Sequence, residues 1–207
     1  MNSLRLVRYG LWGAVAIAAV LAILVAAGVF EGSDADPEAG DAPVNANVEF
    51  GTPFTLVTHT GEPITEAAFQ ETPTLVFFGF TYCPDVCPTA LAEVSGWLAE
   101  LGADAEDLEV YFVSVDPERD VPERLAEYLT AFDERIVGVT GNVEDVHAML
   151  DGYHVYYERY EAENVGYLMD HASSFYLLDR SGDFAGTIAY NDSRDLALER
   201  IRSLIEG

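Results

Sequence analysis

The sequence has only two cysteines, and they lie close together as Cys83 and Cys87 in the segment FTYCPDVCPT. This segment follows a continuous apolar run, and Pro88, which cannot donate an amide hydrogen, fits the first turn of a following helix. Cys83 is therefore predicted in the loop before that helix and Cys87 at its start. The positive end of a helix dipole lowers the pKa of nearby thiols. The pattern thus predicts thiolates accessible near neutral pH, which both redox exchange and metal binding require.

Three kinds of chemistry fit this cysteine pair. A structural disulfide would close only a short loop, and such a loop contributes little stability. Thiol-disulfide exchange is the second possibility, although the familiar redox motif has two intervening residues and this one has three. A soft-metal site is the third, because two thiolates with one imidazole select Cu(I), whereas a closed zinc site needs four ligands. The spacing favours a metal site and leaves the redox alternatives open.

The sequence contains four histidines that could complete such a site. His59 falls in a predicted hairpin turn and His147 in a predicted helix, where we expect solvated or capping roles, and His154 falls in a tyrosine-rich loop. His171 follows Asp170 and opens the apolar strand of a predicted closing hairpin. A carboxylate beside a ligating imidazole often fixes the imidazole's tautomer. We therefore choose His171 as the third ligand.

The elements that must position these residues alternate in type along the chain. Continuous apolar runs predict buried strands, and caps, prolines and apolar faces predict helices. The expected strands are residues 74–80, 108–115 and 136–140, the expected helices are 87–101, 120–132, 142–150 and 193–205, and hairpins are expected at 50–65 and 174–190. This order predicts an α/β fold whose central sheet is parallel at first, antiparallel at its closing hairpin, and covered by helices. Ligand sites of such sheets lie beyond the carboxyl ends of the strands, which is where Cys83 falls.

The first thirty residues differ from the rest of the chain. Arg5 and Arg8 precede an uncharged run from Tyr9 to Phe30, which exceeds the roughly 20 residues needed to cross a bilayer. The positive flank favours a cytoplasmic N-terminus and an extracytoplasmic domain. A cleaved signal peptide is the alternative, but its apolar region would be shorter, about 7 to 15 residues. The predicted division is residues 1–30 as a membrane anchor, 31–47 as an acidic flexible linker, and 48–207 as the folded domain.

The charge of the chain is strongly negative, with 36 acidic residues against ten basic ones and a formal net charge of -26. Nucleic-acid binding is excluded as a function class, because it relies on clustered cationic side chains. All ten basic residues are arginine, and the part beyond residue 30 carries every acidic residue with eight arginines, a net charge of -28. Such self-repulsion is tolerated most easily in high salt. The composition predicts a salt-loving source, with an ordinary soluble acidic surface as the alternative.

Three motifs together resemble the Sco/SenC family of copper chaperones. They are TYCPDVCPT, the segment SVDPERDVP from Ser114 to Pro122, and YLMDHASSFYLLD from Tyr167 to Asp179. The resemblance implies a thioredoxin-like fold anchored to the membrane. It also implies a role outside the cytoplasm in assembling the dinuclear CuA centre of cytochrome c oxidase.

Carried over to matching positions, the resemblance implies that Cys83, Cys87 and His171 hold one copper ion, as Cu(I) or Cu(II). Asp116 and Asp170 match family acids, for which supporting or partner-facing roles are expected. The implied partners are the CuA-bearing oxidase subunit, a thiol reductant, and the membrane through the N-terminal helix. The expected function is copper delivery to the CuA centre. Reduction of that subunit's ligand cysteines is the alternative, and a copper or redox sensor is a third reading of the same residues.

Overall fold

The computed structural model describes residues 50–162 and 166–207 of the chain. The predicted anchor and linker lie outside these residues, so they remain predictions. Within the described part of the chain, no helix has both the length and the apolar character needed to cross a membrane.

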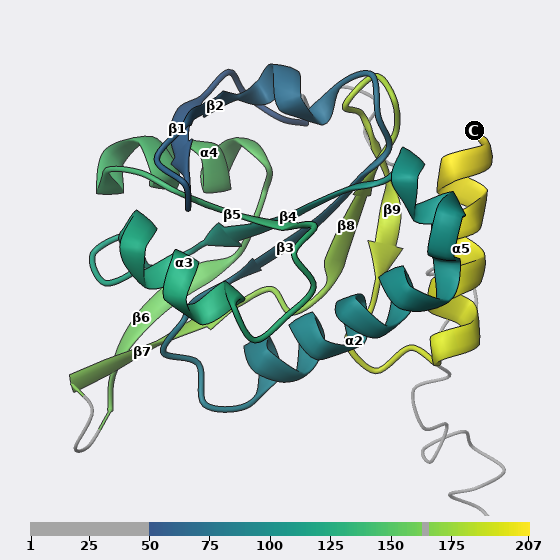
Figure 1. Ribbon diagram of the computed structural model, residues 1–207. Helices are drawn as coiled ribbons and strands as arrows, with labels where there is room; N and C mark the ends of the chain where they lie inside the picture. Colours follow the sequence, from purple (N-terminus) through teal and green to yellow (C-terminus); the bar gives the residue numbers. More distant parts are fainter. Residues whose placement is uncertain (1–49, 163–165) are drawn as a thin grey trace, which may run out of the picture. The chain divides into compact units, whose positions relative to one another are not determined.

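A seven-stranded mixed sheet forms the centre of the domain, in the order β2-β1-β5-β4-β3-β8-β9 (Figure 1). Its strands are β1 Thr55–Thr58, β2 Pro63–Thr65, β3 Thr74–Gly79, β4 Glu109–Ser114, β5 Ile136–Thr140, β8 Phe175–Leu178 and β9 Phe184–Ile188. Strands β3, β4 and β5 are parallel, whereas β8 pairs antiparallel with β3 and with β9. The predicted mixed sheet with an antiparallel closing hairpin is therefore confirmed. Every residue of β3 is buried, as its continuous apolar run predicts.

Helices cover both faces of this sheet, with α2, α3 and α5 in front of it and α4 behind it in Figure 1. The helices are α2 Val86–Leu101, α3 Pro122–Leu129, α4 Val143–Gly152 and α5 Arg194–Glu206, with short 3-10 turns η1 Glu66–Phe69 and η2 Gly102–Asp107. Two predicted caps are confirmed. The Asn142 side chain accepts a hydrogen bond from the Asp145 amide, and the Ser193 hydroxyl accepts one from the Leu196 amide.

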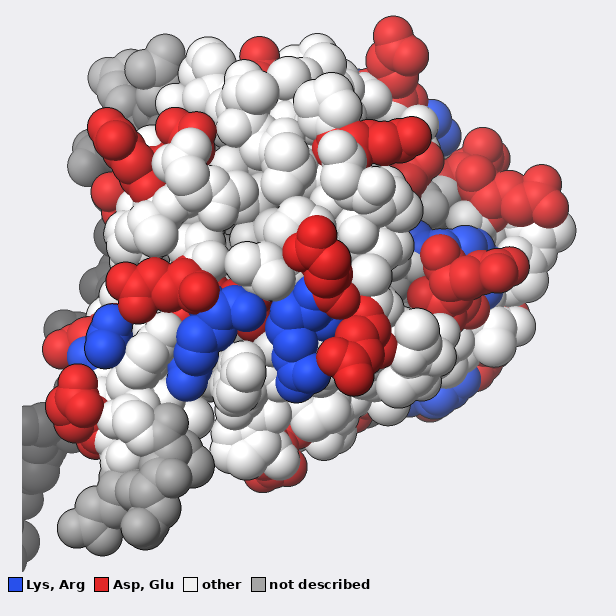
Figure 2. All heavy atoms as spheres, turned by 60° about the vertical axis from the view of Figure 1, so that its left-hand side comes forward, with Lys and Arg blue, Asp and Glu red and all other residues white. Residues whose placement is uncertain are grey.

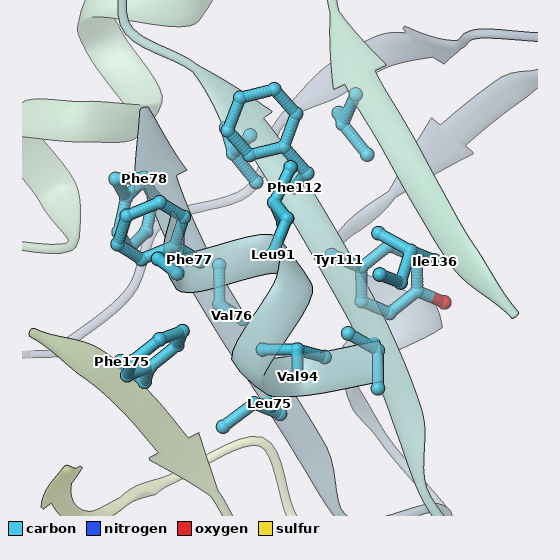
Figure 3. Packing of buried hydrophobic residues seen from close by; sticks show 14 of the residues in the cluster. Leu75, Val76, Phe77, Phe78, Leu91, Val94, Tyr111, Phe112, Ile136 and Phe175 are labelled. Atoms are coloured by element: carbon cyan, nitrogen blue, oxygen red, sulfur yellow. The ribbon is translucent and has the colours of Figure 1, made fainter. Parts of the chain in front are cut away.

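The core covers both faces of the sheet, and one part of it lies between α2 and the central strands, where aromatic and branched side chains pack together (Figure 3). The ring centre of Phe77 on β3 lies 4.9 Å from that of Phe175 and 6.2 Å from that of Phe112. All three side chains are fully buried. Burial of each contributes about 1.5–3 kcal/mol. The carboxyl end of β3, where the cysteines follow, is therefore held by closely packed, fully buried side chains.

The structure differs from the prediction between residues 157 and 171. Strands β6 Tyr157–Ala162 and β7 Gly166–His171 form a separate two-stranded antiparallel sheet, where a loop was expected. His171 ends β7 and does not open the closing hairpin, since β8 begins at Phe175. Most side chains of β6 are exposed, so its sequence lacks the buried apolar stripe that normally reveals a strand. In Figure 1 this β6-β7 hairpin projects from the body at the lower left.

Candidate metal centre

The two cysteines lie at the junction between β3 and α2, as predicted. Cys83 is half-buried in the loop, where its amide donates to the carbonyl of Phe80 over 3.3 Å. Cys87 is fully buried in the first turn of α2. Its amide donates to the sulfur of Cys83 over 3.3 Å. Both thiols are free, and an amide at the N-terminus of the helix thus points at one of them.

The junction also depends on a glycine that sequence reasoning did not single out. A Cβ atom at Gly79 would lie 2.9 Å from the Cys87 sulfur and 2.7 Å from the ring of Phe112. Both separations are shorter than van der Waals contact. Gly79 therefore lets the buried thiol sit directly against the end of β3.

His171 is brought to the cysteines from a position 84 residues further along the chain than Cys87. Its Nε2 atom lies 3.5 Å from the Cys87 sulfur. Its Nδ1 atom lies 2.9 Å from the carbonyl oxygen of Ala172. A carbonyl only accepts hydrogen bonds, so Nδ1 carries the proton in neutral imidazole and Nε2 presents its lone pair to the sulfurs. That tautomer is the one a metal ligand at Nε2 requires.

The spacing of these atoms fits ligands of one ion. For a metal such as zinc, bonds of about 2.3 Å to sulfur and about 2.0 Å to nitrogen place two ligands roughly 3.4–3.8 Å apart. The 3.5 Å separation between Cys87 and His171 lies in this range. Residues 50–162 and 166–207 nevertheless hold no group of three His, Cys, Asp or Glu side chains already arranged to bind an ion.

The two thiols have opposite electrostatic environments. A hydrogen bond from the Cys87 side chain lowers the pKa of Cys83 to about 4, although partial burial acts in the opposite direction. The same hydrogen bond, together with burial, raises the pKa of Cys87 above its ordinary value. The metal-free pair is thus one thiolate, Cys83, that accepts from one thiol, Cys87. Cys83 is the more exposed of the two and the better nucleophile.

A cleft of about 300 Å³ opens beside this pair, between the cysteine loop and the β6-β7 hairpin. Its walls include Phe80, Cys83, Asp85, Leu168 and His171. The cleft gives an ion or a thiol of another molecule access to Cys83.

The comparisons with known proteins agree with this geometry. The SCO1/SenC family matches residues 42–206, which contain the cysteine pair and His171. The chain belongs to the SCO1/SenC family. The yeast "Protein SCO2, mitochondrial" (Saccharomyces cerevisiae) is 37% identical over 164 residues, covering 78% of this chain and 54% of that protein. The human "Protein SCO1 homolog, mitochondrial" is 38% identical over 144 residues, covering 68% and 48%.

Among solved structures, "Structure of Bradyrhizobium japonicum ScoI with copper bound" matches with a TM-score of 0.70 and 36% identity, covering 75% of this chain and 99% of that one. The expected thioredoxin-like fold of the SCO1/SenC family is confirmed. The chain spans about half the length of the yeast and human relatives.

The two acids that match SCO1/SenC motifs lie around the centre and not in it. Asp170 is exposed on β7, and the Nδ1 position beside His171 that it was expected to support is occupied by the carbonyl of Ala172. Asp116 is 3% exposed and does not line the cleft. It accepts hydrogen bonds from the side chains of Arg119 and Tyr167. Asp116 therefore connects the segment after β4, which contains Arg119, to Tyr167 on β7.

Asp120 supports the cysteine loop, a role that the sequence did not reveal. It was expected to announce a helix, but the cap position of α3 is Val121. The fully buried carboxylate of Asp120 instead accepts from the Thr81 amide over 3.0 Å and its hydroxyl over 2.6 Å, and from the Ser114 hydroxyl over 2.8 Å. Burial raises its pKa. These hydrogen bonds from Thr81 and Ser114 to Asp120, here called the Asp120 hub, connect the residues before Cys83 to the end of β4.

The other three histidines lie away from the cysteines. The Nδ1 atom of His59 accepts from the Gly138 amide over 3.0 Å. The ring centre of His147 lies 4.8 Å from that of Tyr157, and the ring of His154 lies against Phe50. The structure therefore brings His171, and none of these three, to the cysteine pair.

Proposed function

We propose that this chain is a membrane-anchored, extracytoplasmic copper chaperone that delivers copper to the CuA centre of cytochrome c oxidase during assembly. One observation carries the proposal. The fold brings His171, 84 residues after Cys87, to the cysteine pair, so that two reduced sulfurs and one imidazole nitrogen lie together, and Cys83 and His171 line a single cleft. Two sulfurs and one imidazole nitrogen form a soft ligand set that suits copper. The copper-bound structure of Bradyrhizobium japonicum ScoI and the family resemblance also support copper as the metal that is bound.

The arrangement suits an ion that must be released again. Three ligands leave coordination positions open, so a cysteine or histidine of an acceptor can enter before a ligand of this chain departs. Binding displaces the remaining thiol proton of Cys87, so uptake depends on pH. The half-exposed position of Cys83 in the cleft supplies the point of contact for the acceptor.

Copper binding tests the proposal directly. The reduced full-length protein in detergent is expected to bind close to one copper ion per chain, with an optical band from thiolate-to-copper charge transfer when Cu(II) is used. Cys83→Ser and His171→Ala are each expected to remove tight binding, because each deletes one of the three ligands. The control is His147→Ala, since that histidine packs against Tyr157 away from the cysteines. Tight stoichiometric binding in both ligand variants would refute the proposal.

A second candidate function is supported by the asymmetry of the two thiols. An accessible thiolate backed by a buried thiol is the arrangement of a disulfide reductase. The Cys83 thiolate would attack a disulfide between the acceptor's ligand cysteines, which forms a mixed disulfide and releases the first acceptor thiolate. Cys87, once deprotonated, would then attack the Cys83 sulfur of the mixed disulfide and release the second acceptor thiolate. The acceptor leaves with two thiols, this chain is left with a Cys83–Cys87 disulfide, and a thiol reductant restores it with two electrons.

The two functions differ in their need for the histidine. Reduction of a disulfide requires both cysteines and leaves His171 uninvolved, whereas copper transfer requires all three residues. Reduction of the oxidised CuA-bearing subunit and copper transfer to its reduced form can both be measured with the His171→Ala variant. Retained reduction with lost transfer identifies the chain as both a reductase and a chaperone. If His171→Ala loses copper transfer and the native protein shows no reductase activity, the chain is a copper chaperone and not a reductase.

A further inference from the structure

The proposed copper ligands belong to two separate sheets. Cys83 and Cys87 follow β3 of the central sheet, whereas His171 ends β7 of the two-stranded β6-β7 hairpin. No ladder of backbone hydrogen bonds joins these two sheets among the described strands. The distance between His171 and the cysteines therefore depends on the short link from His171 to Phe175, on the contacts of its ring with Phe77 and Phe80, and on other side chains that connect the hairpin to the body.

Arg119 makes the most extensive of these connections. Its Nη1 atom donates to the carbonyl oxygen of Tyr167 on β7 over 3.0 Å. Its guanidinium carbon lies 3.6 Å from the centre of the Tyr167 ring. Its Nε atom donates to the buried carboxylate of Asp116, which also accepts from the Tyr167 hydroxyl over 2.8 Å. Arg119 and Asp116 thus hold Tyr167, near the beginning of β7, through its backbone carbonyl, its aromatic ring and its hydroxyl group.

The same guanidinium also contacts the cysteine loop. It lies 4.6 Å from the ring centre of Tyr82, the residue before Cys83. Arg119 therefore touches both segments that carry the proposed ligands. On the side of the molecule where β6, β7 and α3 lie, Figure 2 shows arginines in a short row among carboxylates. Among the arginines that form ion pairs in the described residues, Arg119 is the least exposed, with 18% of its side chain accessible, so solvent weakens its contacts less than those of the others.

The cysteines have stronger anchors than the histidine. Thr81 is tied to the Asp120 hub, and Cys87 is embedded in the core beneath α2. No residue of β6 or β7 is fully buried and six of their twelve residues are exposed, whereas every residue of β3 is buried, so the hairpin is the segment more able to open locally. When copper is passed on, His171 is therefore the ligand best placed to leave first.

We propose that Arg119 is a positioning residue, which holds the β6-β7 hairpin against the cysteine loop and thereby sets the rate at which His171 leaves copper. The inference rests on the proposed function, because it assumes that copper is the ion held and released. It goes beyond that function by naming the ligand that leaves and the side chain that restrains it.

The test compares copper release and local opening in Arg119→Gln, Arg119→Lys and the native full-length protein in detergent. Loss of the planar guanidinium removes charged hydrogen bonds and stacking, so Cu(I) transfer to the chelator bicinchoninate is expected to be about tenfold faster or more in both variants. Amide hydrogen exchange of β7 is expected to rise by a similar factor, whereas exchange of β3 and β4 stays unchanged. Tyr167→Phe, which removes only the hydroxyl bond to Asp116, is expected to show a smaller increase and guards against misfolding of the arginine variants.

Arg194→Gln is the matched control, because Arg194 also donates to a carboxylate and to a backbone carbonyl but joins α5 to α2. It should leave both measurements unchanged. Unchanged β7 exchange in the Arg119 and Tyr167 variants, or unchanged copper release in both Arg119 variants, would overturn the inference. If the native protein bound no copper, the proposed function would fail, while hydrogen exchange would still decide whether Arg119 holds the hairpin.

Discussion

At the residue scale, two cysteines four positions apart acquire different chemistry from their surroundings. Cys83 receives hydrogen bonds from the amide and the thiol of Cys87, so its negative charge is stabilised. Cys87 is buried beside Gly79, where its hydrogen bond to the Cys83 sulfur, burial and the neighbouring negative charge all raise its pKa. The sequence alone predicts lowered pKa values at the helix start for both. It does not predict which thiol is buried, because that depends on the close approach of β3 at Gly79.

The asymmetry predicts selective alkylation of the reduced, metal-free protein. The pKa of Cys83 is lowered from the ordinary thiol value of 9.0, so Cys83 remains a thiolate down to pH 6. Its reaction with iodoacetamide should therefore remain fast as the pH falls from 9 to 6. Cys87 should stay unmodified. The measurement is the rate of modification at each cysteine by mass spectrometry across this pH range.

Cys87→Ala is the informative variant for this experiment. It removes the thiol that donates to Cys83, so the fall in rate should move to higher pH. A Cys83 rate that already falls tenfold per pH unit just below 9 in the native protein would contradict the assignment of the thiolate.

At the element scale, the strands and helices predicted from the sequence, and the one hairpin that was missed, differ in how their apolar residues are arranged. Strand β3 is predicted because its unbroken apolar run is buried on both faces, and α4 and α5 begin at their predicted caps. The β6-β7 hairpin is missed because polar, exposed residues make up most of β6. His171 could be chosen as a ligand from its neighbours, but its position at the end of β7 could not.

The Asp120 hub predicts a stability effect at the same scale. Asp120→Ala leaves the amide and hydroxyl of Thr81 and the hydroxyl of Ser114 buried without their acceptor. The free energy of unfolding should fall by about 3 kcal/mol, measured by urea denaturation. The control is Asp104→Ala, an exposed acid in η2, which should change it by less than about 0.5 kcal/mol. Equal stability of the two variants would show that water replaces the hub's hydrogen bonds.

At the scale of the whole molecule, the charge is a property of the part beyond residue 30, with 36 acidic residues and eight arginines. Figure 2 shows carboxylates spread over the visible face, with arginines confined to a few places beside them. Six arginines of the described residues already form ion pairs. Most of the negative charge is therefore uncompensated, and the folded state concentrates it more than the unfolded chain does.

This imbalance predicts that stability rises with salt. The Debye length falls from about 10 Å at 0.1 M to about 3 Å at 1 M, so repulsion between separated carboxylates is largely screened in strong salt. Between 0.1 and 2 M KCl we expect a gain on the order of 2 kcal/mol and a Tm higher by about 4–8 °C. Sucrose at matched osmolality is the control, because it stabilises by exclusion without screening charge. Full stability in dilute buffer, or an equal gain in sucrose, would mean that the acidic surface serves only solubility and that no salt-loving source is implied.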